Sequence, residues 1–178
     1  MLFTEKQQLN LWWLYLILGA EAVIMGTIFV YEQKGLTFEA LANIYFIPVW
    51  AILLPFAIIF VVNKSVFRFE IDENGIRYRY FPFVRRKSIS WDEVLVVYLR
   101  KYDALGEYGG WGVKTRLWFK LKDKAFIFND QNIGLQFELV KRKKLLFSTS
   151  KREELQLFLL NLKQKHQISA IDPDVRER

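Results

Sequence analysis

Two runs of consecutive basic residues are the side chains in this sequence best suited to bind another molecule. They comprise Arg85, Arg86 and Lys87 in the first run, and Lys141, Arg142, Lys143 and Lys144 in the second. Arginine and lysine bind carboxylates and phosphates by charge and by hydrogen bonds. Both runs fall where we expect turns between strands, so their side chains can project together toward anionic lipid headgroups or a partner protein. The same charges are equally compatible with a basic surface that contacts only solvent.

A glycine-rich loop at residues 106–112 contributes two aromatic residues, Tyr108 and Trp111. The loop is not a phosphate cradle, because it lacks the Gly-Lys-Ser/Thr ending of a P-loop and precedes a predicted strand instead of a helix. One interpretation is a tight corner at which Trp111 folds onto the β-rich domain. The other is a lipid- or partner-binding surface on which Tyr108 and Trp111 are both exposed.

Glu21 is the one acidic or basic residue in the apolar run at residues 11–31. A carboxylate inside a membrane is costly to ionise, and such a residue is a candidate for proton or cation handling. This role would fit a small transporter or channel component that oligomerises around Glu21. The simpler interpretation is a carboxyl group that stays protonated, or that forms a hydrogen bond across a helical hairpin or a dimer interface.

Residue types that catalysis or metal binding would need are scarce. The chain has no cysteine, which excludes disulfides, thiolate zinc sites, iron–sulfur clusters and a cysteine nucleophile. Its single histidine, His166, has no partner ligands nearby in the sequence. Acidic pairs such as Asp92 and Glu93 are adjacent, and adjacent residues of a strand point to opposite faces. We therefore expect no enzyme activity, no metal and no cofactor, and we find no motif for binding nucleic acid.

Apolar and charged residues are segregated along the chain. The first 62 residues carry 2 basic and 4 acidic residues, whereas residues 63–178 carry 24 basic and 15 acidic residues. Residues 11–31 and 42–62 are apolar runs that would each form a helix about 31 Å long, close to the roughly 30 Å hydrocarbon core of a bilayer. We therefore predict that residues 1–63 form a short N-terminal segment and a two-helix transmembrane hairpin.

The distribution of basic residues predicts how this hairpin would be oriented. The segment between the two runs contains one basic residue, Lys34, whereas the basic residues Lys64 and Arg68 closely follow the second run. Basic residues are enriched on the cytoplasmic side of membrane proteins. We therefore predict a multi-pass protein of the inner (cell) membrane with both termini in the cytoplasm.

From residue 64 onward the apolar residues alternate with polar ones, as in strands. Asn74 and Gly75 form a typical hairpin turn between two alternating segments. The predicted strands are residues 66–71, 76–80, 84–90, 94–100, 113–121, 125–128, 135–140 and 144–147. Ser150 and Glu153 have the spacing of a capping box at the start of an amphipathic helix that ends near residue 165. We expect residues 167–178 to be a disordered tail.

A series of strands closed by one C-terminal helix resembles the pleckstrin-homology (PH) fold. More narrowly, residues 107–114, 134–139 and 146–155 resemble bacterial membrane-anchored PH-like proteins of uncharacterised function, which carry a similar YGGWG loop. The resemblance covers roughly residues 66–165. It implies that residues 64–166 form an all-β PH-like barrel plugged by the helix, and it supplies no catalytic residues.

Together these patterns predict a membrane-anchored PH-like adaptor or regulatory module with a membrane α-hairpin. Its basic turns, and Tyr108 and Trp111, would bind anionic membrane lipids or a partner protein at the inner membrane surface, and a second copy of the chain is a further candidate partner. The alternative is the transporter or channel component built around Glu21.

Overall fold

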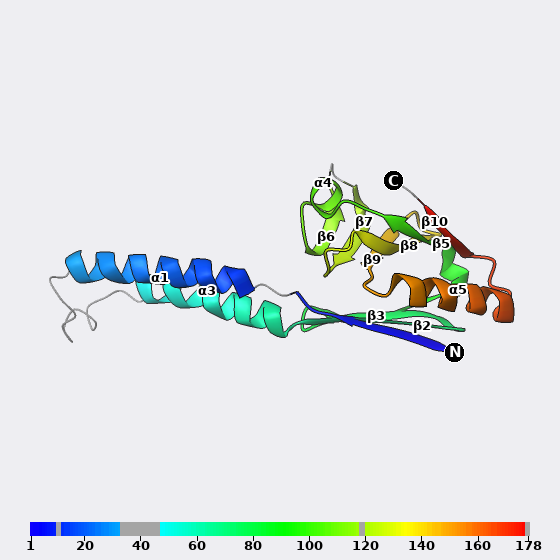
Figure 1. The fold of residues 1–178 in the computed structure, drawn as a ribbon, viewed down its shortest axis with the longest axis horizontal. Coiled ribbons are helices and arrows are strands. Elements are labelled where there is room, and N and C mark those ends of the chain that lie inside the picture. The colour runs from blue at the N-terminus through cyan, green and yellow to red at the C-terminus, as the bar shows by residue number, and fades with distance from the viewer. Residues whose placement is uncertain (10–11, 33–46, 118–119, 177–178) are drawn as a thin grey trace. The chain divides into compact units, whose positions relative to one another are not determined.

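The computed structural model describes residues 1–9, 12–32, 47–117 and 120–176, and the chain divides into two compact units (Figure 1). One unit comprises Met1–Leu9 together with Ser65–Arg178, and the other is Asn10–Lys64. The division after Lys64 agrees with the composition change near residue 63. The first nine residues differ from our prediction, because they belong to the β-rich unit and not with the helices.

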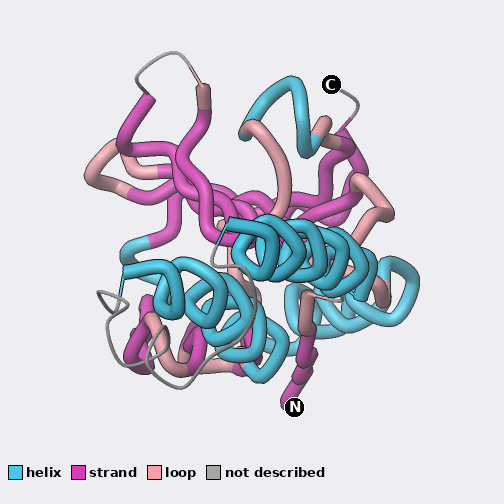
Figure 2. Tube along the Cα trace, turned by 90° about the vertical axis from the view of Figure 1, so that its left-hand side faces the viewer, coloured by secondary structure: helices cyan, strands magenta, loops and turns pink. Residues whose placement is uncertain are grey.

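The smaller unit contains two helices, α1 (Trp12–Glu32) and α3 (Ile47–Lys64). They lie side by side in both views (Figures 1 and 2), and the Asn63 side-chain amide donates a hydrogen bond of 2.9 Å to the Tyr15 hydroxyl. Many of their large apolar side chains are exposed, among them Val23 and Ile58. The segment between the predicted spans, including Lys34, lies outside the described residues.

Within the residues that the structure describes, neither α1 nor α3 nor any other helix combines the length and the apolar character needed to cross a membrane. This finding contradicts the predicted transmembrane hairpin at residues 11–31 and 42–62. The multi-pass inner-membrane location with cytoplasmic termini was inferred from that hairpin, so it is contradicted as well. The described helix over the second run begins at Ile47, which is later than the apolar run that we counted from residue 42.

The larger unit is built from two sheets. The four-stranded sheet has the order β1 (Leu2–Gln7), β2 (Val66–Asp72), β3 (Gly75–Phe81) and β4 (Val84–Ser90). The six-stranded sheet has the order β10 (Ile171–Arg176), β5 (Val94–Lys101), β8 (Ile133–Leu139), β9 (Lys144–Ser148), β7 (Lys120–Ile127) and β6 (Gly112–Arg116). A 3₁₀ turn (Trp91–Glu93) and two helices, α4 (Ala104–Tyr108) and α5 (Arg152–His166), complete the unit. The predicted strands are thus confirmed as β2 to β9, with shifted boundaries, and the predicted helix as α5. The exception is the predicted strand 113–121, which runs past the end of β6 at Arg116 and into the start of β7.

The two sheets form separate layers and do not close into a barrel (Figure 1). The first sheet ends at strands β1 and β4, and the second ends at β10 and β6, so each sheet keeps two edges. The predicted PH-like closed barrel is therefore wrong, although most of its strands and its helix are present. The predicted disordered tail also differs from the structure, because β10 pairs in parallel with β5.

A layer of aromatic side chains joins the inner faces of the sheets. The Phe67 ring on β2 stacks on Phe126 and on Phe128, with ring centroids 5.0 Å and 5.1 Å apart. Phe147 on β9 packs edge-on against Phe67 at 5.3 Å. Helix α5 adds a stripe of fully buried leucines to this core, of which Leu159 is one. Stacked and edge-on rings of this kind contribute roughly 1 kcal/mol per pair beyond the area that they bury.

A polar clasp also joins the sheets, and it centres on the carboxylate of Glu5 in β1. Glu5 is 2% exposed and accepts hydrogen bonds from the Thr149 hydroxyl at 2.7 Å and from the Ser150 backbone N–H at 2.8 Å. The side-chain amide of Gln7 donates to Glu5 at 2.7 Å and to the Ser148 carbonyl at 2.6 Å. These contacts connect the four-stranded sheet with the segment that follows β9.

The clasp changes the predicted start of helix α5. Ser150 does not form the expected capping box, because its hydroxyl donates to Glu5 at 2.9 Å. The residue before the helix is Lys151, which makes no side-chain capping hydrogen bond. Strand β1 itself was missed in the sequence because two of its inward-facing residues, Glu5 and Gln7, are polar and hide the alternation of a buried strand.

Removing the central carboxylate tests whether the clasp holds the two sheets together. We expect Glu5→Ala to lower the free energy of unfolding by about 3 kcal/mol, because buried donors lose a charged acceptor. Urea denaturation of the full chain measures the change. The exposed neighbouring residue Gln8 provides the control, and a Glu5→Ala variant as stable as Gln8→Ala would show that the clasp is dispensable.

Candidate functional site

The outward face of the four-stranded sheet carries an arginine cluster, which we define as Arg68, Arg77, Arg79 and Arg86 around Glu70. Side chains alternate between the two faces of a strand. Since Phe67 and Phe69 of β2 are buried in the core, Arg68 and Glu70 point outward. Tyr78 and Tyr80 of β3 are buried in the same way, which places Arg77 and Arg79 on that outer face.

The strand register sets basic side chains directly opposite one another. Arg68 on β2 pairs with Arg79 on β3, and Lys6 on β1 pairs with Arg68. Like charges opposite each other in a sheet are destabilising. A row of three cations across three strands therefore has a cost for folding, and the ion pair between Arg68 and Glu70 offsets only a part of it.

A β-bulge in β4 adds further positive charge at the edge of the sheet. Val84 pairs with Tyr80 and Lys87 with Tyr78, so that Arg85 and Arg86 both stand opposite the single residue Arg79. Bulges redirect side chains and are common beside functional sites. This bulge concentrates three arginines at one point of the β3–β4 edge.

Glu70 is the shared partner of the cluster. Its carboxylate forms ion pairs with Arg68 at 2.8 Å, Arg77 at 3.4 Å and Arg86 at 3.2 Å. Arg77 also pairs with Asp72. One carboxylate cannot neutralise three guanidinium groups, so the cluster retains excess positive charge.

Two observations show hydrogen-bonding capacity that remains unused. Neither the Arg79 side chain nor the Lys6 side chain forms an ion pair or a hydrogen bond with a described residue. The Nε atom of Arg68 is buried and likewise makes no hydrogen bond to any described residue. The four arginines, Glu70 and Tyr78 line a pocket of about 100 Å³. The arrangement can therefore accept an anion.

The structure separates the two basic runs that the sequence singled out. In the first run, Arg86 belongs to the arginine cluster, and Arg85 and Lys87 are exposed beside it on β4. The second run lies at the turn between β8 and β9 in the other sheet, and it consists of Lys141, Arg142, Lys143 and Lys144. No contact described by the structure joins the two runs.

The second run lies partly beside acidic residues. Lys144 is engaged by Glu138, with 2.6 Å between the ammonium nitrogen and the carboxylate oxygen. Lys141 and Lys143 line a pocket of about 360 Å³ together with Asp92 and Glu93. The two lysines of this pocket are matched by two carboxylates, whereas the arginines outnumber the carboxylates in the arginine cluster. This pocket is therefore less suited to an anion than the arginine cluster.

The glycine-rich loop forms helix α4 and the turn that follows it. Asp103 caps this helix, accepting backbone hydrogen bonds from Leu105 at 3.0 Å and Gly106 at 2.9 Å. Gly109 ends the helix with φ of 72°, a conformation that favours glycine. Tyr108 is 2% exposed and Trp111 is 42% exposed. Of the two aromatic residues predicted to form a contact surface, only Trp111 can therefore reach a partner.

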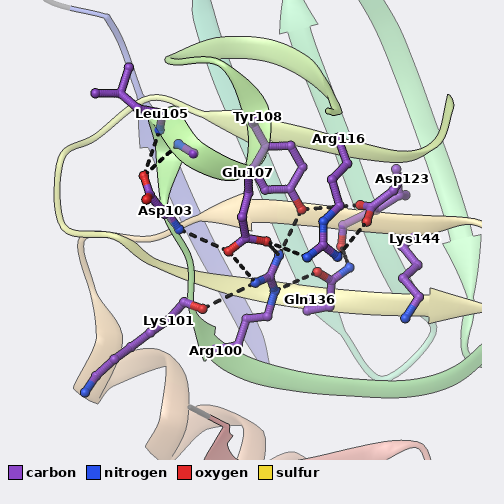
Figure 3. Close-up of polar contacts among 12 residues, drawn as sticks. Arg100, Lys101, Asp103, Leu105, Glu107, Tyr108, Arg116, Asp123, Gln136 and Lys144 are labelled. Carbon is purple, nitrogen blue, oxygen red and sulfur yellow. Dashed lines mark hydrogen bonds and ion pairs between the residues drawn. The ribbon is translucent and has the colours of Figure 1, made fainter. Parts of the chain in front are cut away.

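Tyr108 belongs to a buried network of polar side chains on the outer face of the six-stranded sheet (Figure 3). Arg100 donates to Glu107 at 3.0 Å and to the Tyr108 hydroxyl at 2.9 Å. Arg116 pairs with Glu107 at 3.1 Å and with Asp123 at 3.4 Å. Two guanidinium groups thus face two carboxylates, and this balance indicates a structural role for the network.

The protonation of Glu107 follows from these contacts. Burial acts to raise the pKa of Glu107, but the hydrogen bonds and charge of Arg100, with a contribution from Arg116, outweigh burial and hold the pKa below its ordinary value. Burial also raises the pKa of Tyr108, so its hydroxyl stays protonated and donates to Asp123 at 3.3 Å. The network therefore anchors α4 as an ionised, internally neutral unit.

Among its described residues, the structure has no binding site around Glu21 and no cluster of metal-ligating side chains. Glu21 is exposed on α1, and it makes no hydrogen bond or ion pair to the residues that the structure describes. The transporter alternative required transmembrane helices, and no helix in the described part of the chain is long and apolar enough to be one. Over the described part of the chain, no three His, Cys, Asp or Glu side chains lie close enough together to hold a metal ion.

Substitution of Glu107 tests the structural role of the network. We expect Glu107→Gln to destabilise the fold by about 3 kcal/mol at neutral pH, because Arg100 would be left buried without its charge partner. The lowered pKa of Glu107 means that its ionised form stabilises the fold above the ordinary value of 4.5, and that this contribution is lost as the pH falls through the folded-state pKa.

Urea denaturation at several pH values measures both effects. The difference between Glu107→Gln and the unsubstituted protein should shrink as the pH is lowered from about 7 to about 3. Glu153→Gln, at an exposed position on α5, is the matched control. A difference that stays constant over this pH range would contradict the assignment.

No protein-family model matches the chain, and no curated protein matches it either. The resemblance of residues 66–165 to bacterial membrane-anchored PH-like proteins therefore stays a prediction, and the closed barrel that it implied is absent from the described part of the structure.

Proposed function

We propose that this chain is a non-catalytic binding module that recognises an anionic partner protein through the arginine cluster. One observation carries the proposal: the outer face of the four-stranded sheet gathers five cations, from Lys6 and the four arginines, against the two carboxylates of Glu70 and Asp72. The opposed cations disfavour this face in isolation. A partner that supplies negative charge would offset that cost.

The residue types favour a protein as the partner. Arginine and aromatic side chains are enriched at the energetic centres of protein interfaces. The last residue of β3, Phe81, is 62% exposed, and Phe83 in the turn that follows is 55% exposed. Phe81 is two residues from Arg79 along β3 and so points to the same face, where the guanidinium groups can provide charged contacts and its ring an apolar contact.

Binding is favoured over catalysis by the state of the central carboxylate. Glu70 is held by three guanidinium groups and is therefore poorly placed to act as a base toward a substrate. Anionic lipid headgroups carry charges that the cluster could also bind, and binding to lipid vesicles separates that possibility from a protein partner. A second copy of the chain stays a prediction as a further partner.

Charge removal within and outside the cluster tests the proposal. We expect the full chain to bind a glutamate-rich peptide with an affinity that falls as salt is added, because the contacts are between partly exposed charges. Arg79→Gln and Arg68→Gln should each weaken binding about tenfold, equivalent to about 1.4 kcal/mol. Isothermal titration calorimetry at two salt concentrations measures these changes.

The second basic run supplies a control that is matched in charge. Lys141→Gln and Arg142→Gln remove the same charge from exposed positions outside the cluster, and we expect them to change the affinity less than twofold. If these two substitutions weaken binding as much as Arg79→Gln does, the net charge of the chain alone explains the affinity and the proposal fails. Stronger binding to phosphatidylserine vesicles than to the peptide would also overturn the choice of a protein partner.

A further inference from the structure

Glu70 already occupies the place where an anion would bind. Its carboxylate lies within ion-pair distance of Arg68, Arg77 and Arg86, and its side chain is 15% exposed. Any ligand that reaches these guanidinium groups must compete with a carboxylate that is part of the same sheet. The chemistry of a successful ligand is limited by this competition.

A carboxylate ligand has no advantage in such a competition. It offers one negative charge and two acceptor oxygens, the same as Glu70, and it also loses translational freedom on binding. A phosphate monoester carries a charge of about −1.5 to −2 at neutral pH and three strong acceptor oxygens. With its third oxygen and its additional charge, it can form more charge-assisted hydrogen bonds with the guanidinium groups than a carboxylate can.

The charge and the donors of the cluster match such a dianion. Lys6 and the four arginines exceed the two carboxylates on this face by three charges. The Arg79 side chain forms no ion pair or hydrogen bond with a described residue, and the buried Nε of Arg68 has no described acceptor. The Arg79 guanidinium lines the pocket and can bind additional oxygens without giving up an existing contact.

The pocket also has the necessary room. Its volume of about 100 Å³ is several times the roughly 10–15 Å³ that one water molecule requires on the same measure. A phosphate group could enter while Glu70 turns away, since the carboxylate lies at the surface of the sheet and not in the aromatic core.

We infer that the arginine cluster recognises a phosphorylated side chain of the partner protein, and that the phosphate monoester displaces Glu70 from the guanidinium groups. This inference rests on the proposed function and names the anion. Glu70 then acts as an internal competitor that weakens the binding of ordinary acidic side chains more than the binding of phosphate. Binding involves no covalent step.

Three peptides that differ at one position test the inference on the full chain. The position carries phosphoserine, glutamate or serine, in an otherwise identical sequence. We expect the phosphoserine peptide to bind at least tenfold more tightly than the glutamate peptide, and the serine peptide not to bind measurably. Inorganic phosphate should compete with the phosphoserine peptide.

Glu70→Gln separates competition from general attraction. Removing the internal carboxylate should strengthen binding of the glutamate peptide severalfold and reduce the preference for phosphoserine. Arg79→Lys keeps the charge but loses the planar pair of donors, so it should weaken phosphoserine binding severalfold. Lys141→Gln, outside the cluster, should leave all three affinities unchanged, and circular dichroism checks that each variant is folded.

The outcomes distinguish the inference from the function on which it rests. Equal affinity for the phosphoserine and glutamate peptides would overturn the inference and leave the proposed function standing. Failure of both peptides, and of the glutamate-rich peptide, to bind would overturn both. Tighter binding to vesicles containing phosphatidic acid than to the phosphoserine peptide would assign the phosphate to a lipid and also overturn the inference.

Discussion

The buried carboxylate of Glu5 is the contact on which the arrangement of the β-rich unit depends. It gathers hydrogen bonds from Thr149 and Ser150 and thereby joins β1 to the segment after β9. Strand β1 follows no hairpin into the sheet, since residues 10–64 separate it from β2. Side-chain bonds across the two sheets therefore supplement its pairing with β2. The position of Lys6 beside Arg68, and hence one end of the cation row, follows from the same placement.

Two charged clusters in the same unit differ in how well their positive and negative charges balance. This difference distinguishes a structural network from a surface that can bind a ligand. Arg100 and Arg116 face Glu107 and Asp123, and this network is mostly buried and internally neutral (Figure 3). The arginine cluster is partly exposed and has more cations than Glu70 and Asp72 can neutralise. The charged groups of a buried network must pair with one another because water is excluded. A surface cluster can remain unbalanced, since water or a ligand completes it.

Local patterns predicted strands β2 to β9 and helix α5, because the conformation of each is set largely by residues close to one another in the chain. The turn at Gly75 confirmed this most clearly, with two backbone N–H groups bound by the Asp72 carboxylate. The closed barrel and the transmembrane hairpin were wrong for a different reason. The hydropathy of an apolar run does not by itself show that its helix crosses a membrane, and the order of strands along the sequence does not show whether the last strand pairs with the first.

For this protein, the sequence by itself determined most strands of the β-rich unit and helix α5, the lack of cysteine chemistry and the excess of basic residues after residue 63. It also identified Arg86 as a candidate binding residue. Only the tertiary structure decided that Arg86 joins Arg68, Arg77 and Arg79, and that the run at residues 141–144 lies in another sheet. The physical reason is strand register: it sets which side chains stand opposite one another, and it depends on pairing and bulges between segments that no local pattern encodes.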